Sequence, residues 1–179
     1  MNPIEHRRFR DTCGQFGTGV TIVTTHHEND DHGMTANAFM SVSLEPRLIA
    51  ISIAERARML PKLLASGRFA VSILAEGMDD IAWHFAGKPK DHLTGLFERR
   101  DGLPLIKGAC ADFTAGVHQA VPAGDHTVII GQVLSFASAP GSRPLLFHRG
   151  KFGRMADAHA APPELFDAEY SDPAADIVW

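Results

Sequence analysis

The sequence GMTANAFMSVSLEPRLIAISI, residues 33–53, decides the fold class predicted for this chain. Its first half carries small and hydroxylated side chains, and its end, residues 48–53, has the apolar content of a buried strand. The pair Glu45-Pro46 separates the two parts. The residue before a proline is pushed out of helical backbone conformations, so no helix is expected to run through this point. A segment of little side-chain bulk beside a buried strand leaves backbone N–H and C=O groups within reach of a flat, polar-edged ligand.

The composition is that of one globular domain. The chain has 179 residues, 45% hydrophobic and 21% charged, and its net charge is −4 with histidine neutral. A chain of this length buries about 70% of its unfolded surface. The negative charge argues against nucleic acid or an anionic membrane as the main partner. No apolar run approaches the roughly 20 residues that span a bilayer, so no membrane segment is expected.

Two further features predict a cytoplasmic protein with reduced thiols. The first ten residues are polar and contain no apolar signal core. Cys13 and Cys110 form no C-x-x-C motif and are expected to be small core residues.

Periodicity predicts a mainly β chain. Apolar residues at helical spacing predict a helix over residues 3–16 that stops at Gly17. Residues 109–121 and 126–137 are β-branched-rich runs around a turn, which predicts a hairpin. Further strands are expected at residues 18–25, 47–53, 68–74 and 145–148, further helices within 55–67 and 76–86, and a loop over 87–102.

These elements indicate an antiparallel barrel of six or seven strands with two or three short flanking helices. No βαβ alternation is present, which argues against a doubly wound sheet and favours a small barrel. The composition changes near residue 156. Residues 1–156 are therefore expected to form the domain, and residues 157–179 an extended arm that could pack on a partner subunit.

Two motif-like stretches are set aside. The segment HHENDDH, residues 26–32, has the composition of a metal site, but Asn and Asp dominate solvated turns and nothing nearby completes four ligands. No metal site is expected there. Gly17-Thr18-Gly19 lacks the third glycine of a dinucleotide fingerprint, because Ile22 stands in that place, and a helix precedes the strand.

Five blocks in order resemble the flavin reductase domain family, the short-chain reductases of two-component flavin monooxygenases. The blocks are FGTGVTIVTT (16–25), GMTANAFMSVSLEP (33–46), SGRFAVSIL (66–74), GDHTVIIGQV (124–133) and PLLFHRGKF (144–152). The resemblance implies a split barrel that binds flavin at a homodimer interface. It also implies that NADH or NADPH reduces FMN or FAD, and that the reduced flavin passes to a separate monooxygenase.

The resemblance assigns the small-residue stretch to flavin binding. Backbone groups around Thr35, Ala36, Asn37 and Ala38 would meet the isoalloxazine ring. The ribityl and phosphate side would be lined by Ser41, Val42 and Ser43. The alternative is a bulged strand of small residues whose serines bond only their own backbone.

The phosphate site departs from the family pattern. Where relatives often carry Ser or Thr, this chain has Arg56 and Arg58, and arginine binds phosphate in a bidentate manner. Lys90 would add charge. The alternative is that these are ordinary surface residues. The departure leaves open whether the chain binds FMN or FAD. It also leaves open whether flavin is a substrate that leaves or a tightly bound group.

His126 is the residue that the resemblance places beside the nicotinamide. We expect it to orient the carboxamide or to screen the reduced flavin, since hydride transfer itself needs no general base. The alternative is a histidine in a turn at a strand start. His148 has the same two interpretations. Phe152 stands where a tyrosine is common in relatives, so a hydroxyl role is lost there.

Two rival functions follow from the same residues. Hydride transfer is the chemistry of the cofactors, and the chain shows no Ser-His-Asp or Cys-His arrangement of its own. A flavin-binding module without turnover, such as a carrier, sensor or partner subunit, would therefore need the same stretch. An oxidase related to pyridoxamine-phosphate or haem-handling barrels fits residues 33–46 poorly.

Overall fold

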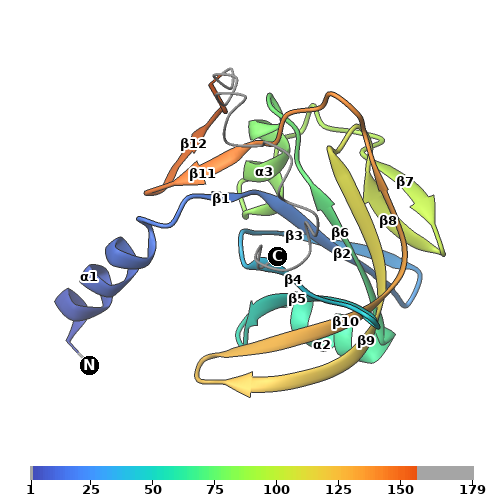
Figure 1. The fold of residues 1–179 in the computed structure, drawn as a ribbon, viewed down its shortest axis with the longest axis horizontal. Coiled ribbons are helices and arrows are strands. Elements are labelled where there is room, and N and C mark those ends of the chain that lie inside the picture. The colour runs from blue at the N-terminus through green and yellow to red at the C-terminus, as the bar shows by residue number, and fades with distance from the viewer. Residues whose placement is uncertain (1, 157–179) are drawn as a thin grey trace, which may run out of the picture.

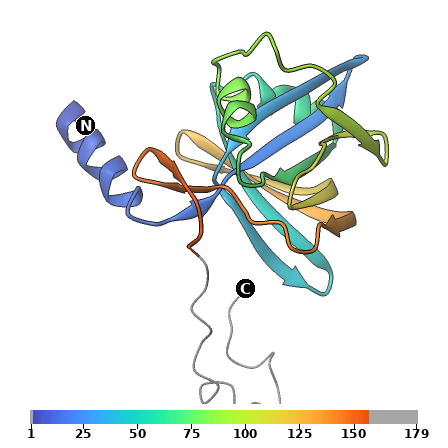
Figure 2. The ribbon, with the colours of Figure 1, turned by 90° about the horizontal axis from the view of Figure 1, so that it is seen from above.

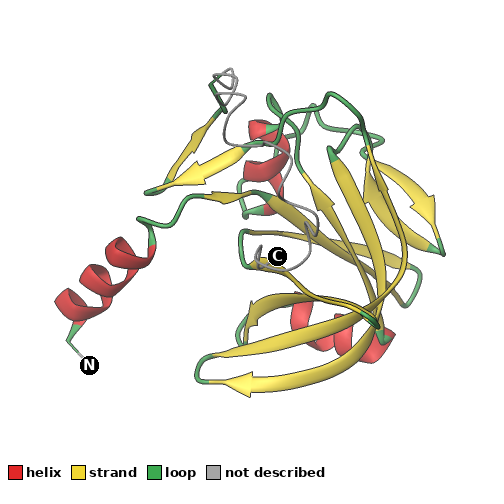
Figure 3. Ribbon diagram, in the orientation of Figure 1, coloured by secondary structure: helices red, strands yellow, loops and turns green. Residues whose placement is uncertain are grey.

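The computed structural model describes residues 2–156 of the chain. Strands dominate these residues, and three short helices lie at the periphery (Figure 3). The elements are α1 (Pro3–Cys13), β1 (Thr18–Gly19), β2 (Thr21–His27), β3 (Asp30–Ala36), β4 (Phe39–Leu44), β5 (Arg47–Ala54), α2 (Met59–Ser66), β6 (Arg68–Ile73), α3 (Asp79–Phe85), β7 (Phe97–Arg100), β8 (Leu103–Ile106), β9 (Ala111–Ala123), β10 (His126–Ser138), β11 (Leu146–His148) and β12 (Lys151–Gly153).

The main sheet has seven antiparallel strands in the order β3-β2-β6-β9-β10-β5-β4 (Figure 1). Its two edge strands, β3 and β4, are consecutive in the chain, and only Asn37 and Ala38 join them. A sheet whose edges are joined by two residues must curl until those edges meet at one end. The predicted split barrel, with its six or seven strands, is therefore confirmed.

The β9–β10 hairpin has the two longest strands of the main sheet. Each strand has 13 residues, and the pairing runs from His126 opposite Ala123 to Ser138 opposite Ala111. Gly124 adopts φ 67°, which a turn of two residues requires and which glycine tolerates. The predicted hairpin is confirmed, with a turn shorter than the sequence suggested.

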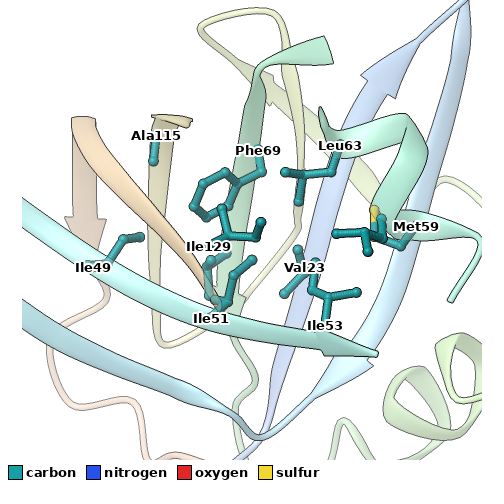
Figure 4. Packing of buried hydrophobic residues seen from close by; sticks show 11 residues of the cluster. Val23, Ile49, Ile51, Ile53, Met59, Leu63, Phe69, Ala115 and Ile129 are labelled. Carbon is teal, nitrogen blue, oxygen red and sulfur yellow. The ribbon is translucent and has the colours of Figure 1, made fainter. Parts of the chain in front are cut away.

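The barrel interior is an apolar core closed at one end by α2. Met59, Leu60 and Leu63 of this helix pack with side chains of β2, β5, β6, β9 and β10 (Figure 4). Phe69 lies at its centre with no exposed surface. A β-carbon at Gly131 would lie 2.4 Å from the Phe69 Cζ atom, so the large ring fits only because residue 131 is glycine.

A second core lies on the other face of β2, where α3 covers the sheet. Ile22 belongs to this core, whereas its neighbour Val23 faces the barrel interior. Ala82 of α3 and Leu145 before β11 complete it. Because both faces of β2 are buried, this strand lacks the polar alternation of a solvent-facing strand.

The N-terminal helix differs from its prediction. Asn2 caps α1, and the helix ends at Cys13 with Gly14 as the cap, three residues before the predicted end at Phe16. None of its residues is buried, and the helix stands away from the barrel in both views (Figure 1 and Figure 2). Its apolar residues Ile4 and Phe9, together with Phe16 beyond it, are exposed, as is Cys13, which the sequence placed in the core.

Two predicted loops contain strands. Residues 26–32, expected to be a turn, lie mostly in the β2–β3 hairpin, and only Glu28 and Asn29 form the turn, with φ 51° and 60°. The predicted loop over residues 87–102 contains β7, which pairs with β8 around Asp101 and Gly102. Both hairpins turn through two residues with positive φ, as a type I′ turn requires.

The C-terminal arm predicted over residues 157–179 lies outside the described residues, and its separation from the domain stays a prediction. Within residues 2–156, no helix is long and apolar enough to cross a membrane.

Candidate active site

A cavity of about 240 Å³ opens where β3 ends against α3 and the β11–β12 hairpin. Aromatic and small residues form most of its lining, and Thr35 and Asn37 add polar groups. The lining residues are Val20, Thr35, Ala36, Asn37, Trp83, Ala86, Phe147, Gly150 and Phe152. The volume lies below the ~300–1,000 Å³ of sites that enclose a whole drug-sized ligand. It suits one ring system of a larger nucleotide.

Residues 35–38, at and just after the end of β3, are called the cradle below, and side-chain hydrogen bonds hold them in place. Thr35 Oγ1 donates to the Ala82 carbonyl at 2.6 Å, which ties β3 to α3. Thr21 Oγ1 donates to the Ala36 carbonyl at 2.7 Å, and Asn37 Nδ2 lies 3.3 Å from Thr18 Oγ1. Asn37 and Ala38 are exposed, so the backbone that joins β3 to β4 is accessible at the cavity mouth.

Strand β5 connects this cradle with His126. The Ser52 N–H donates to the Ala38 carbonyl at 3.3 Å, and two residues further along the strand Ala54 pairs with His126 of β10. Neighbouring strands lie about 4.8 Å apart and a strand rises about 3.4 Å per residue, so two strand spacings and the two-residue offset separate Ala38 from His126 by roughly 12 Å. The structure thus places on either side of β5 two predicted groups that lie far apart in the sequence.

The His126 side chain is half-exposed and is held by a carboxylate. Its Nδ1 atom lies 2.8 Å from Asp125 Oδ1. This hydrogen bond, together with the charge of His126 and then that of Arg56, holds the pKa of Asp125 below its usual range. Asp125 is fixed in turn by its carbonyl, which accepts from the Glu55 N–H at 2.9 Å. Arg56, Asp125 and His126 therefore form one charged group at the end of β5.

The residues of β4 lie on the free edge of the sheet. A register shift falls between Ser41 and Ser43, so β4 has the bulge of the alternative interpretation, which had not been assigned to a residue. Ser43 Oγ accepts from the Glu45 N–H at 3.2 Å, so this serine bonds its own backbone as in the alternative interpretation. Ser41 and Val42 are exposed on the same edge.

The remaining predicted residues lie apart from the cavity. Arg58 is the N-cap residue of α2 and makes no capping bond with its side chain, so its guanidinium is not committed to the helix end. Lys90 forms an ion pair with Asp80 at 3.1 Å, which offsets its charge. His148 is exposed on β11 and is not part of the cavity lining, although its neighbour Phe147 is.

Sequence reasoning missed the aromatic wall of the cavity. Trp83 comes from α3, Phe147 from β11 and Phe152 from β12. The sequence assigned no binding role to any of them, and noted Phe152 only as a position where a hydroxyl role is lost. One signal was present. In the segment 76–86 the residues at helical spacing are Met78, Ile81, Ala82 and Phe85, and Trp83 is not among them. A large aromatic ring outside the core face of a helix indicates a contact elsewhere.

The histidine-rich segment makes histidine–carboxylate contacts within its own hairpin. His26 Nδ1 lies 2.7 Å from Asp31 Oδ1, and His32 Nε2 lies 2.9 Å from Asp30 Oδ2. Between residues 2 and 156, no group of three or more His, Cys, Asp or Glu residues is arranged to hold a metal ion.

Comparison with known proteins identifies the class. Residues 13–156 match the family model described as flavin reductase like domain, and the chain belongs to this family. The reductase component of 4-hydroxyphenylacetate 3-monooxygenase from Thermus thermophilus is 38% identical over 147 residues, covering 82% of this chain and 95% of that protein. An NADH-dependent flavin reductase from Rhodococcus is 42% identical over 146 residues, covering 80% and 82%.

A solved structure gives the same result. Flavin reductase PheA2 in its native state is 44% identical and superposes with a TM-score of 0.81, covering 87% of this chain and 99% of that chain. The predicted family and fold are confirmed. The predicted enzyme class and cofactor classes agree with these relatives, whose names give no support to a module without turnover.

Proposed function

We propose that this chain is an NAD(P)H-dependent flavin reductase, which transfers a hydride from nicotinamide to FMN or FAD. The observation that carries this proposal is the aromatic cavity at the exposed backbone of Asn37 and Ala38, one strand away from His126 on the other side of β5. A flat ring with one apolar and one polar edge fits such a site. Family membership supports the same reaction.

The chain's own residues bind and orient the two rings. When bound, the nicotinamide and the flavin supply the hydride chemistry themselves. Trp83, Phe147 and Phe152 line the apolar end of the cavity and give a bound ring an aromatic surface to contact. The backbone of Asn37 and Ala38 offers hydrogen bonds to the polar ring edge, where fixed donors stabilise developing negative charge.

The charged group at the end of β5 completes the site. His126 is restrained by Asp125 and half-exposed, so its ring can hydrogen-bond to a carboxamide above the flavin without acting as a base. Arg56 and Arg58 follow β5 directly and carry the charge that a flavin phosphate needs. Lys90 is a weaker candidate because Asp80 already pairs with it.

The active form is a homodimer in this proposal. An isolated helix of 11 residues is marginal in water, yet α1 buries none of its residues within the chain. The free edge strand β4 also exposes Met40, Val42 and Leu44. A second copy that covers α1 and β4 would account for both features, and light scattering of the purified protein tests it.

The reduced flavin would pass to a separate flavin-dependent monooxygenase in the cytoplasm. The Thermus thermophilus relative is named as the reductase component of such a system. A barrel with an open site edge suits a flavin that leaves after reduction.

Nicotinamide oxidation tests the reaction. NADH and NADPH would each be supplied with FMN and with FAD, and the loss of nicotinamide absorbance followed. Flavin-dependent turnover is the expected result. If flavin bound but no combination of nicotinamide and flavin gave turnover, the enzyme hypothesis would be rejected in favour of the non-catalytic flavin-binding module.

A further inference from the structure

Glu55, the residue that follows β5, holds both chain neighbours of His126. Its backbone N–H donates to the Asp125 carbonyl at 2.9 Å. Its carboxylate accepts a hydrogen bond from the Thr127 hydroxyl. His126 lies between these two residues at the start of β10, so a single residue fixes the backbone on either side of the imidazole. Glu55 does not line the aromatic cavity, so this contact is distinct from it.

The Thr127 hydroxyl makes this contact a strong restraint on Glu55. Thr127 is 5% exposed and pairs with Ile53 of β5, whose side chain belongs to the barrel core. A hydroxyl buried beside apolar side chains needs a partner, because leaving it unpaired costs free energy. The bond therefore keeps the Glu55 side chain against β10, although Glu55 itself is an exposed residue.

The segment that holds His126 also carries the arginines proposed to bind phosphate. Arg56 and Arg58 lie one and three residues after Glu55. The pKa of Asp125 is lowered first by its hydrogen bond with His126, then by the His126 charge, and also by Arg56. The arginines and the imidazole are thus joined by a few residues that are bonded to the start of β10. A restraint placed on this segment is transmitted to the imidazole.

We propose that Glu55 is a positioning residue for His126. Through Glu55, a flavin phosphate held by the two arginines restrains the imidazole that faces the nicotinamide. This inference rests on the proposed flavin reduction and adds a coupling between the two ligands of that reaction. A small displacement of a positioning group lowers the rate of a reaction, so a flavin with a phosphate should support faster hydride transfer from NADH than one without.

FMN and riboflavin separate the effect of the phosphate from that of the ring. Both carry the same isoalloxazine ring, and only FMN carries the phosphate. With each flavin at saturation, kcat/KM for NADH is measured from the loss of nicotinamide absorbance. In the wild-type chain we expect kcat/KM to be about fivefold higher or more with FMN. Equal values with the two flavins would overturn the coupling.

Substitution of Glu55 tests the residue itself. Glu55→Ala removes the carboxylate and keeps the backbone N–H, so kcat/KM for NADH with FMN should fall to the riboflavin value. The Kd for FMN should stay within about twofold. Glu55→Gln keeps an oxygen that can accept from Thr127, and should restore most of the advantage of FMN. An advantage that survives in Glu55→Ala would overturn the positioning role.

The Thr127 hydroxyl is tested with a matched control. Thr127→Val removes the donor and should abolish the advantage of FMN over riboflavin. Thr25→Val is the control, because Thr25 is also a buried strand residue and its hydroxyl donates to the Arg68 carbonyl at 2.7 Å. It should lower stability and leave the ratio of the two kcat/KM values unchanged. An equal fall of the ratio in both variants would assign the effect to lost stability and overturn the inference.

A double substitution shows whether Glu55 acts through His126. In a His126→Gln chain, Glu55→Ala should lower kcat/KM for NADH no further. Additive losses would show that Glu55 acts by another route, and would overturn its positioning role. If the wild-type chain oxidised NADH with neither flavin, the proposed function itself would fail, which is a different result from turnover that ignores the phosphate.

Discussion

Gly33 and Phe85 are in such close contact that no other residue fits at position 33 without movement. A β-carbon at Gly33 would lie 2.6 Å from one ring carbon of Phe85 and 2.7 Å from another. Since Gly33 belongs to β3 and Phe85 to α3, this contact sets the distance between the sheet and the helix that carries Trp83.

Gly33→Ala should therefore destabilise the fold and loosen the site together. We expect the free energy of unfolding in urea to fall by about 1–3 kcal/mol, the usual cost of overpacking. We also expect weaker FMN binding. Gly116→Ala in β9 is the control, because a β-carbon there meets no atom within 4 Å. If both variants had the same free energy of unfolding, the close contact between Gly33 and Phe85 would make no contribution to stability.

His126→Gln tests the nicotinamide side of the site. The imidazole is restrained by Asp125, and loss of this restrained ring should lower kcat/KM for NADH about tenfold or more. The Kd for FMN should stay within about twofold, since His126 lies outside the cavity lining. His118→Gln, on the neighbouring strand β9, is the control. Weakened FMN binding with normal NADH kinetics would assign His126 to the flavin instead.

The arginines after β5 are tested with two flavins that differ in one group. Arg56→Gln combined with Arg58→Gln should raise the Kd for FMN about tenfold. The Kd for riboflavin, which lacks the phosphate, should not change. Arg99→Gln on β7, where Asp31 already pairs with the arginine at 2.7 Å, is the control. Equal losses for FMN and riboflavin would contradict a phosphate contact.

Acid stability depends on Asp101, the turn residue between β7 and β8. Hydrogen bonds from Ser135 and then Thr114, each 2.6 Å long, lower the pKa of Asp101. A carboxyl with a lowered folded pKa stabilises the fold above its unfolded pKa of about 3.9, and loses that contribution as the pH falls through the folded value. The free energy of unfolding should therefore fall with pH below about 4.

Two substitutions separate this contribution from the other carboxyl groups. Ser135→Ala removes one donor, and Asp101→Asn removes the titration while tolerating the φ of 52° at this turn. Both should flatten the acid-side slope measured by urea unfolding at a series of pH values. Ser138→Ala, at the end of the same strand, should keep it. A slope that is the same in all four chains would show that Asp101 plays no part.

Five of the seven strands of the main sheet could be predicted because their patterns are local, whereas β3 and β4 were not expected as strands. Residues 47–53 and the long hairpin carry β-branched residues and clear turn signals, and the structure places β5, β9 and β10 there. The β7–β8 hairpin was missed although Asp101-Gly102 is a strong turn signal. Its first strand, FERR, has a single apolar residue, so no alternation marks it.

The cradle could be located from the sequence, but the cavity wall could not. Thr35, Ala36 and Asn37 are consecutive and recognisable, and they line the cavity. Trp83 and Phe152 reach the same cavity from elements nearly 70 residues apart, and only the packing of α3 and β12 brings their rings to 5.1 Å. Such proximity has no local pattern in the sequence.

The two residues that join the edges of the sheet constrain how this protein can diverge. Asn37 and Ala38 close the barrel, and the Phe39 N–H donates to the Asn37 carbonyl while the Ser52 N–H donates to that of Ala38. An insertion at this corner would break both bonds and separate the sheet edges, because tolerance to insertion depends on backbone bonding. Ligand preference at this corner can therefore change by substitution, whereas changes in length are confined to segments such as the one between α3 and β7.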